Sequence, residues 1–326
     1  MRYASVLLLL VLMLAGCTGA PPAPPQPAPS APSRTLTEAK GPGEFTLPEL
    51  LTALTAYLNA DPAEPARAKL AALFERWWGG MKPERTPDML TDDLNGDGSP
   101  EVVTAIGGFK AAEGESPWVM LVVSGKPGAY RVDHVVPKLA PVREGFLYRA
   151  TLVAQPNLTP DQAVELVWLL QTVVGATGGR GWAVTVSWYP GLLKELEPAI
   201  HMPNPTAARV ENQELVISGG LSGGAAAAAM QRLRTDRYVW ARGRWQLADR
   251  QFAPSAYGYH RLIDGIVAES LGKLAEAEVA YREAAEPTRA AIDEPKKLKE
   301  PEKLEQFAGA VRTLARVRLA ALSAGG

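Results

Sequence analysis

The sequence predicts an α+β protein in which a β-rich central domain is flanked by helices at both ends. Three observations lead to this prediction. Leucines recur at helical spacing between residues 46 and 78, short apolar runs separated by turn residues fill the middle of the chain, and helical periodicity returns after residue 255. A chain of 326 residues also has room for about two domains with cores of their own. We therefore expect a multidomain architecture.

The composition excludes several classes of protein. Hydrophobic residues make up 47% of the chain, and 34 Lys and Arg nearly balance 35 Asp and Glu, so a disordered chain is not expected. The same balance leaves no excess positive charge for a phosphate backbone, so no nucleic-acid partner is expected. One cysteine cannot form an internal disulfide, and His134, His201 and His260 lie too far apart for a zinc motif.

The first residues carry a secretion signal. A positive start is followed by an apolar run, residues 6–14, that is too short to span a bilayer as a lasting helix. The next residues, Leu14-Ala15-Gly16-Cys17, resemble the lipobox of bacterial lipoproteins. The resemblance implies that residues 1–16 are a signal peptide and that Cys17 is lipidated and anchors the chain in the membrane. The alternative is an ordinary signal peptide with an incidental cysteine.

The resemblance also implies a location. The chain would lie at the extracytoplasmic face of the membrane, in the cell envelope. Thr18 follows the cysteine where an aspartate would retain a lipoprotein at the inner membrane, so we expect the outer membrane if the source has one. Residues 17–44 then form a tether, because seven prolines between Pro21 and Pro32 favour an extended chain of about 3.1 Å per residue.

Residues 45–82 are expected to form a helical hairpin. Thr46 and Glu49 have the spacing of a capping box at the start of a first helix, and Asp61 has the position of a cap for a second. Gly79 and Gly80 end the apolar stripe. A hairpin of this size is too small to fold alone, so we expect it to pack on the β-rich domain that follows at residues 83–252.

The most informative motif is DLNGDGSPEVV at residues 93–103. It places oxygen-bearing groups at alternate positions, which is the pattern that surrounds a calcium ion with hard ligands. The expected ligands are Asp93, Asn95, Asp97, the main-chain carbonyl of Ser99, and Glu101. The motif resembles the FG-GAP calcium loop of integrin-like propellers, which implies a structural calcium ion and a strand leaving directly from the loop. The alternative is a hairpin turn without metal.

The motif has a second copy 64 residues later. Residues 157–167 align with it position for position but lack both glycines, so we expect the strand to be kept and the ion to be lost. Trp118 and Trp182 each lie seventeen residues after the loop glutamates, Glu101 and Glu165, which predicts that the two units stay in phase. A third unit is expected from Glu214 onward. Three units are too few for a closed propeller, so we expect a partial, propeller-like array.

The C-terminal region, residues 255–326, is expected to be helical. Gly265, Leu271-Gly272, Ala277, Tyr281 and Ala284 resemble the spacing of a tetratricopeptide hairpin, in which small residues lie where two helices touch. A long helix is expected from about 302 to 322. Because such solenoids need three or more repeats, we expect a cap packed on the β-domain, with a peptide-binding groove as the alternative.

These features favour a surface-anchored, non-catalytic lipoprotein that binds a protein or glycan of the envelope. An assembly factor that acts through the C-terminal helices is a second possibility. The catalytic alternative is an envelope serine hydrolase, because Ser222 lies in a G-x-S-x-G motif and Asp249 and His260 follow in the order of a triad. Against it, the chain before Ser222 has the pattern of hairpins, whereas an α/β-hydrolase needs alternating strands and helices.

Overall fold

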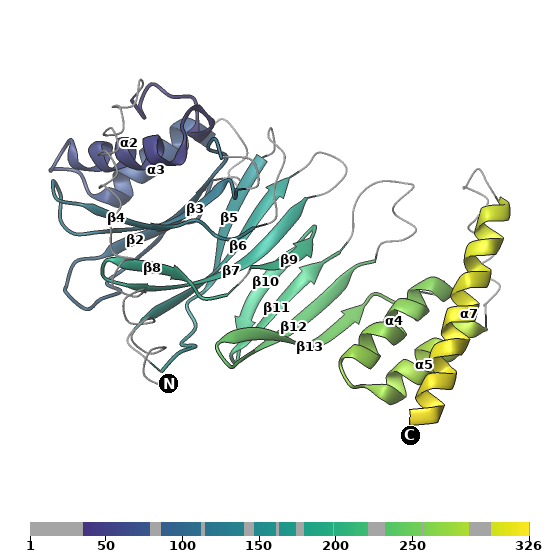
Figure 1. The fold of residues 1–326 in the computed structure, drawn as a ribbon. Helices are drawn as coiled ribbons and strands as arrows, with labels where there is room; N and C mark the ends of the chain where they lie inside the picture. Colours follow the sequence, from purple (N-terminus) through teal and green to yellow (C-terminus); the bar gives the residue numbers. More distant parts are fainter. Residues whose placement is uncertain are drawn as a thin grey trace, which may run out of the picture.

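The computed structural model describes ten segments of the chain, to which all structural statements below refer. They are residues 35–78, 86–111, 115–139, 147–160, 163–173, 179–197, 199–220, 232–255, 257–286 and 301–325. Figure 1 shows helices at the N-terminal end, three β-sheets in the middle and helices again at the C-terminal end. The α+β class predicted from the sequence is confirmed.

The N-terminal helices form the predicted hairpin. A 3-10 turn spans Pro42–Glu44, α2 spans Leu47–Asn59 and α3 spans Ala66–Trp78. The capping box is present, because the Glu49 carboxylate accepts hydrogen bonds from the N–H and the hydroxyl of Thr46, both at 2.8 Å. The second helix begins later than predicted. Asp61 accepts the N–H of Ala63 at 2.8 Å and closes a turn before the helix.

The middle of the chain forms three antiparallel sheets in which consecutive strands are neighbours, except that the last strand of the second sheet pairs with the third strand of that sheet. Sheet 1 contains β1 (Leu90–Asp92), β2 (Glu101–Gly107), β3 (Trp118–Ser124) and β4 (Arg131–Val135). Sheet 2 contains β5 (Leu147–Ala154), β6 (Val164–Val173), β7 (Arg180–Tyr189), β8 (Leu192–Glu195) and β9 (Ile200–Pro203). Sheet 3 contains β10 (Ala207–Glu211), β11 (Glu214–Gly219), β12 (Arg234–Ala241) and β13 (Arg244–Phe252). The third unit therefore begins one strand before Glu214.

The sheets stack face to face, because successive side chains of a strand point to opposite faces. In β2, Val102 packs on the N-terminal helices, whereas Val103 packs on sheet 2. In β6, Leu166 belongs to the core shared with sheet 1, and Val167 belongs to the core shared with sheet 3, where Leu215 of β11 meets it. The order of the layers is therefore helices, sheet 1, sheet 2 and sheet 3 (Figure 1).

The prediction that the two tryptophans occupy equivalent positions is wrong. Gly107 of β2 is paired with Trp118, and the residue equivalent to Gly107 in the second unit, Gln171, is paired with Gly181. Trp182 is thus one residue out of phase, and a shift of one residue reverses the face to which a side chain points. Trp118 points from sheet 1 toward sheet 2, Trp182 points from sheet 2 toward sheet 1, and both are buried in one core.

The C-terminal region forms the predicted helical hairpin and a third helix. The helices are α4 (Gly258–Ser270), α5 (Leu274–Ala285) and α7 (Pro301–Gly325). Helix α7 packs on both members of the hairpin. Gly265 of α4 lies against the fully buried ring of Tyr281, and a Cβ at this position would come within 2.4 Å of the ring. The expected contact between a small residue and a filling aromatic ring is confirmed.

The three sheets remain open within the described segments, where no closed barrel or propeller forms. The outer face of sheet 3 is mostly polar: Thr235, Arg237, Asp249 and Gln251 lie on it beside Val216 and Val239. None of the described helices has both the length and the apolar character required to cross a membrane.

A carboxyl group connects sheets 2 and 3. Glu197, which follows β8, accepts the main-chain N–H of Trp245 at 2.8 Å through Oε2. The indole N–H of Trp245 donates to the hydroxyl of Thr185 in β7, also at 2.8 Å. Oε1 of Glu197 is buried and has no hydrogen-bond partner among the described residues. Burial raises the pKa of Glu197 to about 7.

We expect Glu197→Gln to stabilise the protein at pH 8 and to have little effect at pH 5. Because the folded pKa is about 7 and the ordinary value is 4.5, protonation favours the folded state, and this stabilisation is lost as the pH rises through 7. Glutamine keeps an acceptor for Trp245 and cannot ionise. Glu197 is only half-buried, so screening reduces the gain to about 1 kcal/mol, or about 2–4 °C.

Thermal unfolding of both chains at pH 5 and pH 8 checks this expectation. Glu276→Gln, at an exposed position of α5, is the control for removal of one charge. Equal melting temperatures of wild type and Glu197→Gln at pH 8 would contradict it.

Candidate functional site

The predicted calcium loop folds as a tight turn between β1 and β2. The Asp93 carboxylate accepts the N–H groups of Asp97 at 3.0 Å and Gly98 at 2.9 Å. The side-chain carbonyl of Asn95 accepts the N–H of Asp97 at 2.8 Å, and the Asp97 carboxylate accepts the N–H of Ser99 at 2.7 Å. Gly98 has a φ of 82°, which glycine adopts without strain. The side chains named by the motif therefore gather in one turn.

Glu101 closes the loop from the side of the sheet. It is the first residue of β2 and is fully buried, and its carboxylate accepts the N–H of Leu94 at 2.9 Å and the side-chain amide of Asn95 at 3.1 Å. Burial raises the pKa of Glu101, and the carboxylates of Asp97 and Asp93 raise it further. A cation would relieve this repulsion, and the oxygen donors present are those that calcium prefers.

The second loop repeats this arrangement with a different donor. Glu165 is 1% exposed, and its carboxylate accepts the N–H of Leu158 at 2.9 Å and the hydroxyl of Thr159 at 2.5 Å. Leu158 and Thr159 are the equivalents of Leu94 and Asn95. The buried glutamate with two donors from its own loop is thus common to both loops.

The carboxylates of the first loop bind N–H groups of the same loop. Within the described segments, no group of three or more His, Cys, Asp and Glu side chains is gathered closely enough to hold a metal ion. The donor set of residues 93–101 fits calcium chemically, and calcium binding there stays a prediction.

A second candidate site lies between sheet 3 and the C-terminal hairpin. It is a groove of about 490 Å³, lined by the end of β13 and by α4 and α5. Its apolar wall comes from the two helices and consists of Val267, Ala268, Leu271, Ala275, Val279 and Ala280. Its charged lining residues are Asp249, Arg250, Arg261, Asp264, Lys273, Glu276 and Glu283. The groove thus combines an apolar wall with a strongly charged lining.

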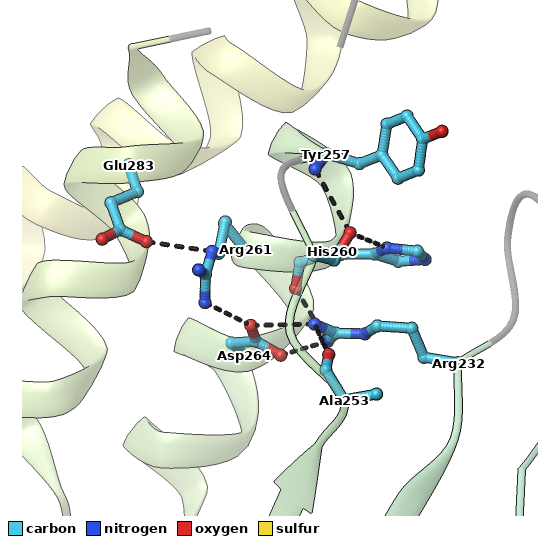
Figure 2. Close-up of polar contacts among 8 residues, drawn as sticks. Arg232, Ala253, Tyr257, His260, Arg261, Asp264 and Glu283 are labelled. Atoms are coloured by element: carbon cyan, nitrogen blue, oxygen red, sulfur yellow. Dashed lines mark hydrogen bonds and ion pairs between the residues drawn. The ribbon is translucent and has the colours of Figure 1, made fainter. Parts of the chain in front are cut away.

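Arg232 holds the helices against the sheet beside this groove. Both terminal nitrogens of its guanidinium pair with the carboxylate of Asp264 on α4. The same group donates to the carbonyls of Ala253 at 3.2 Å and His260 at 3.3 Å, and it lies 4.4 Å from the centre of the Phe252 ring. Figure 2 shows how the guanidinium reaches from the β12 side into the start of α4. Such a planar, multiply bonded arginine fixes orientation as well as distance.

Arg261 extends the network from α4 to α5. It pairs with Asp264 at 3.3 Å and with Glu283 of α5 at 2.9 Å, as Figure 2 shows. On the other rim, Lys273 pairs with Asp249 of β13 at 2.6 Å. Burial works to raise the pKa of Asp249, but hydrogen bonds from Lys273 and Gln251 outweigh it, so the pKa lies below its ordinary value. Ion pairs therefore connect β13, α4 and α5 around the groove.

The residues of the catalytic alternative have other partners. Asp249 belongs to the ion pair with Lys273, and Nδ1 of His260 shares a hydrogen bond of 2.6 Å with the hydroxyl of Ser255. In a serine hydrolase the carboxylate would hold that ring nitrogen. Ser222 and Cys17 lie outside the described residues.

A groove at the C-terminal helices was expected only as the alternative, and the part that β13 takes in it was not predicted from the sequence. Val279 lies two residues from Ala277 and from Tyr281, both of which face the helix interface. An apolar residue in that register must point away from the interface, and Val279 is 55% exposed. The part of the groove lined by β13 depends on packing between segments that are distant in sequence. The spacing of apolar residues along the chain does not indicate such packing.

Comparisons with known proteins give no further assignment. No model of a protein family matches the chain, and no curated protein and no solved structure matches it either.

We expect Asp264→Ala to destabilise the chain by about 2–3 kcal/mol, because it leaves the guanidinium of Arg232, of which 7% is exposed, without its carboxylate. The matched control is Asp249→Ala, which removes a more exposed ion pair with Lys273 and should cost less than about 1 kcal/mol. Urea unfolding of the two variants and wild type measures the difference. Equal losses of unfolding free energy in the two variants would contradict the expectation that the Arg232–Asp264 pair contributes more to stability than the Lys273–Asp249 pair.

Proposed function

We propose that this chain is a lipid-anchored, non-catalytic binding or scaffold protein of the cell envelope. The observation that carries the binding role is the groove between β13, α4 and α5, which combines an apolar wall with a charged lining. The anchor and the location are supported by the motif that ends at Cys17 and by the proline-rich tether at residues 17–44. The partner we propose is a protein or glycan of the envelope.

The rigidity of the groove supports binding. Its two walls belong to different parts of the fold, and ion pairs from Arg232, Arg261 and Lys273 hold them in place. A site that is already formed avoids much of the entropic cost of ordering side chains when a ligand arrives.

We also propose that the three sheets are a partial, propeller-like array. Each is a four-stranded antiparallel meander, with one additional strand in sheet 2, and neighbouring sheets pack through their faces as propeller blades do. The N-terminal hairpin covers the first sheet, and sheet 3, whose outer face is mostly polar, is the last described layer of the array.

The loop at residues 93–101 would bind one structural calcium ion. Asp93, Asn95, Asp97, the carbonyl of Ser99 and Glu101 would hold it, and the ion would offset the charge of three neighbouring carboxylates. Its contribution would be to the stability of the β1–β2 connection.

We expect calcium to raise the melting temperature of the full chain in mild detergent. For a dissociation constant of about 0.1 mM, a concentration of about 10 mM calcium adds about 2.7 kcal/mol, or roughly 5–10 °C. Asp97→Ala should lose this shift. Asp92→Ala, which removes a neighbouring carboxylate that the motif does not use, should retain it. If calcium leaves wild type unchanged relative to chelator, the loop is a turn without metal.

We expect Cys17→Ser to release the chain from the membrane fraction of cells that process lipoproteins. Serine cannot carry the lipid that is proposed to anchor the chain. The measurement is fractionation together with incorporation of labelled fatty acid, and Thr18→Ser is the control. Retention of Cys17→Ser in the membrane would contradict the anchor. Labelling of the purified chain by a fluorophosphonate that Ser222→Ala abolishes would contradict the non-catalytic assignment.

A further inference from the structure

A short segment at the end of β8, residues 195–197, makes bonds to all three sheets, and we call it the clip. Glu195 is the last residue of β8, and its carboxylate accepts the main-chain N–H of Lys138, at 3.1 Å from Oε2. Lys138 lies in the chain that follows β4 of sheet 1. The N–H of Leu196 donates to the carbonyl of Thr185 in β7 at 3.0 Å. These bonds hold the clip to sheets 1 and 2.

The last residue of the clip reaches sheet 3. Oε2 of Glu197 accepts the N–H of Trp245, whose buried indole donates to the hydroxyl of Thr185. Oε1 of Glu197 is buried as well, and no described residue donates a hydrogen bond to it. A buried oxygen without a donor is costlier when it carries charge than when it is neutral. Ionisation of Glu197 is therefore unfavourable while the clip holds Trp245.

Two charged groups act on the Glu197 carboxyl besides its burial. Glu195 repels its negative charge from within the clip, and Arg244, the first residue of β13, attracts it. Arg244 is exposed to water, so its attraction is screened. Burial outweighs this attraction and raises the pKa of Glu197 to about 7. The groups around Glu197 thus favour its neutral form in the closed clip.

We propose that the clip is a pH-sensitive joint, in which ionisation of Glu197 releases the N–H of Trp245 and loosens the start of β13 from sheet 2. The ionised carboxylate gains hydration by turning from its half-buried position toward water. The indole bond between Trp245 and Thr185 does not depend on Glu197, so the opening stays local. This inference goes beyond the proposed binding function, because it concerns the response of the folded chain to pH.

The direction of the response follows from proton linkage. The pKa of Glu197 is about 7 in the closed clip and has its ordinary value of 4.5 when the side chain is in water. The closed clip therefore binds a proton that the open clip releases, so closure is favoured below pH 7 and weakened as the pH rises through 7. The joint between sheets 2 and 3 is expected to be tight in mildly acidic surroundings and loose in alkaline ones.

Hydrogen exchange at the Trp245 amide, in the full chain in mild detergent, measures the opening. After correction for the intrinsic pH dependence of amide exchange, the protection of Trp245 should fall about fivefold between pH 6 and pH 8, because screening limits the effect at a half-buried site. The amide of Ala253, just beyond the other end of β13, donates to the carbonyl of Leu233. It is the internal reference and should keep its protection.

Three substitutions test the role of charge. Glu197→Gln keeps an acceptor for Trp245 and cannot ionise, so the protection of Trp245 should no longer change with pH. Glu195→Gln removes the repelling carboxylate and should move the midpoint of the change to lower pH. Arg244→Gln removes the attracting cation and should move the midpoint to higher pH. A purely structural role of these side chains would not shift the midpoint in opposite directions.

Three results would each overturn the proposal. They are protection of Trp245 that is independent of pH in wild type, pH dependence that persists in Glu197→Gln, and an equal loss of protection at Ala253, which would mean that sheet 3 opens as a whole. If Glu197→Gln does not fold, the opposite midpoint shifts of Glu195→Gln and Arg244→Gln decide the question, and equal midpoints in both variants would overturn the proposal.

Discussion

The architecture depends on the need of sheets 1 and 2 to bury both of their faces. The strands β2, β3, β6 and β7 are apolar on both sides, so each sheet requires a packed layer above and below it. The N-terminal hairpin supplies the first layer, and sheet 3 supplies the last. Sheet 3 is the last described layer, and most side chains on its outer face are polar. This single constraint explains why a hairpin too small to fold alone is ordered here.

Local signals predicted much of this fold, and they failed where register matters. The capping box at Thr46, the loop before Glu101 and its copy before Glu165 depend on residues a few positions apart, so the sequence reports them directly. The pairing of Trp118 and Trp182 with their partners depends on the hairpin loops between strands. One residue of difference there moves a tryptophan to the other face, although the spacing from the glutamate stays at seventeen residues. Spacing along the chain is therefore a weaker guide to equivalence than a shared hydrogen bond.

The two candidate sites differ in the same way: one is built from residues close in sequence, and the other from distant segments. The donors at residues 93–101 are all local, so the spacing of the motif is sufficient to predict that they gather in one turn. The groove is not local, because β13 and α5 are brought together by the packing of α4, by Arg232 and by the ion pair between Asp249 and Lys273. Arg232 lies between sheet and helix in sequence as well as in space, but nothing in its neighbours indicates that it is bonded to Asp264 and two carbonyls. The several bonds of such an arginine are visible only in the structure, because the sequence shows no more than a positive charge.

The arrangement of the three C-terminal helices explains why the groove lies where it does. A solenoid of several hairpins forms its concave surface from successive repeats, whereas one hairpin has no neighbouring repeat to complete that surface. In this chain, the contact between Gly265 and Tyr281 fixes the angle between α4 and α5, and α7 covers one side of the pair. The other side faces β13. The end of β13 thus closes the other side of the groove, and its Asp249 holds Lys273 at the start of α5.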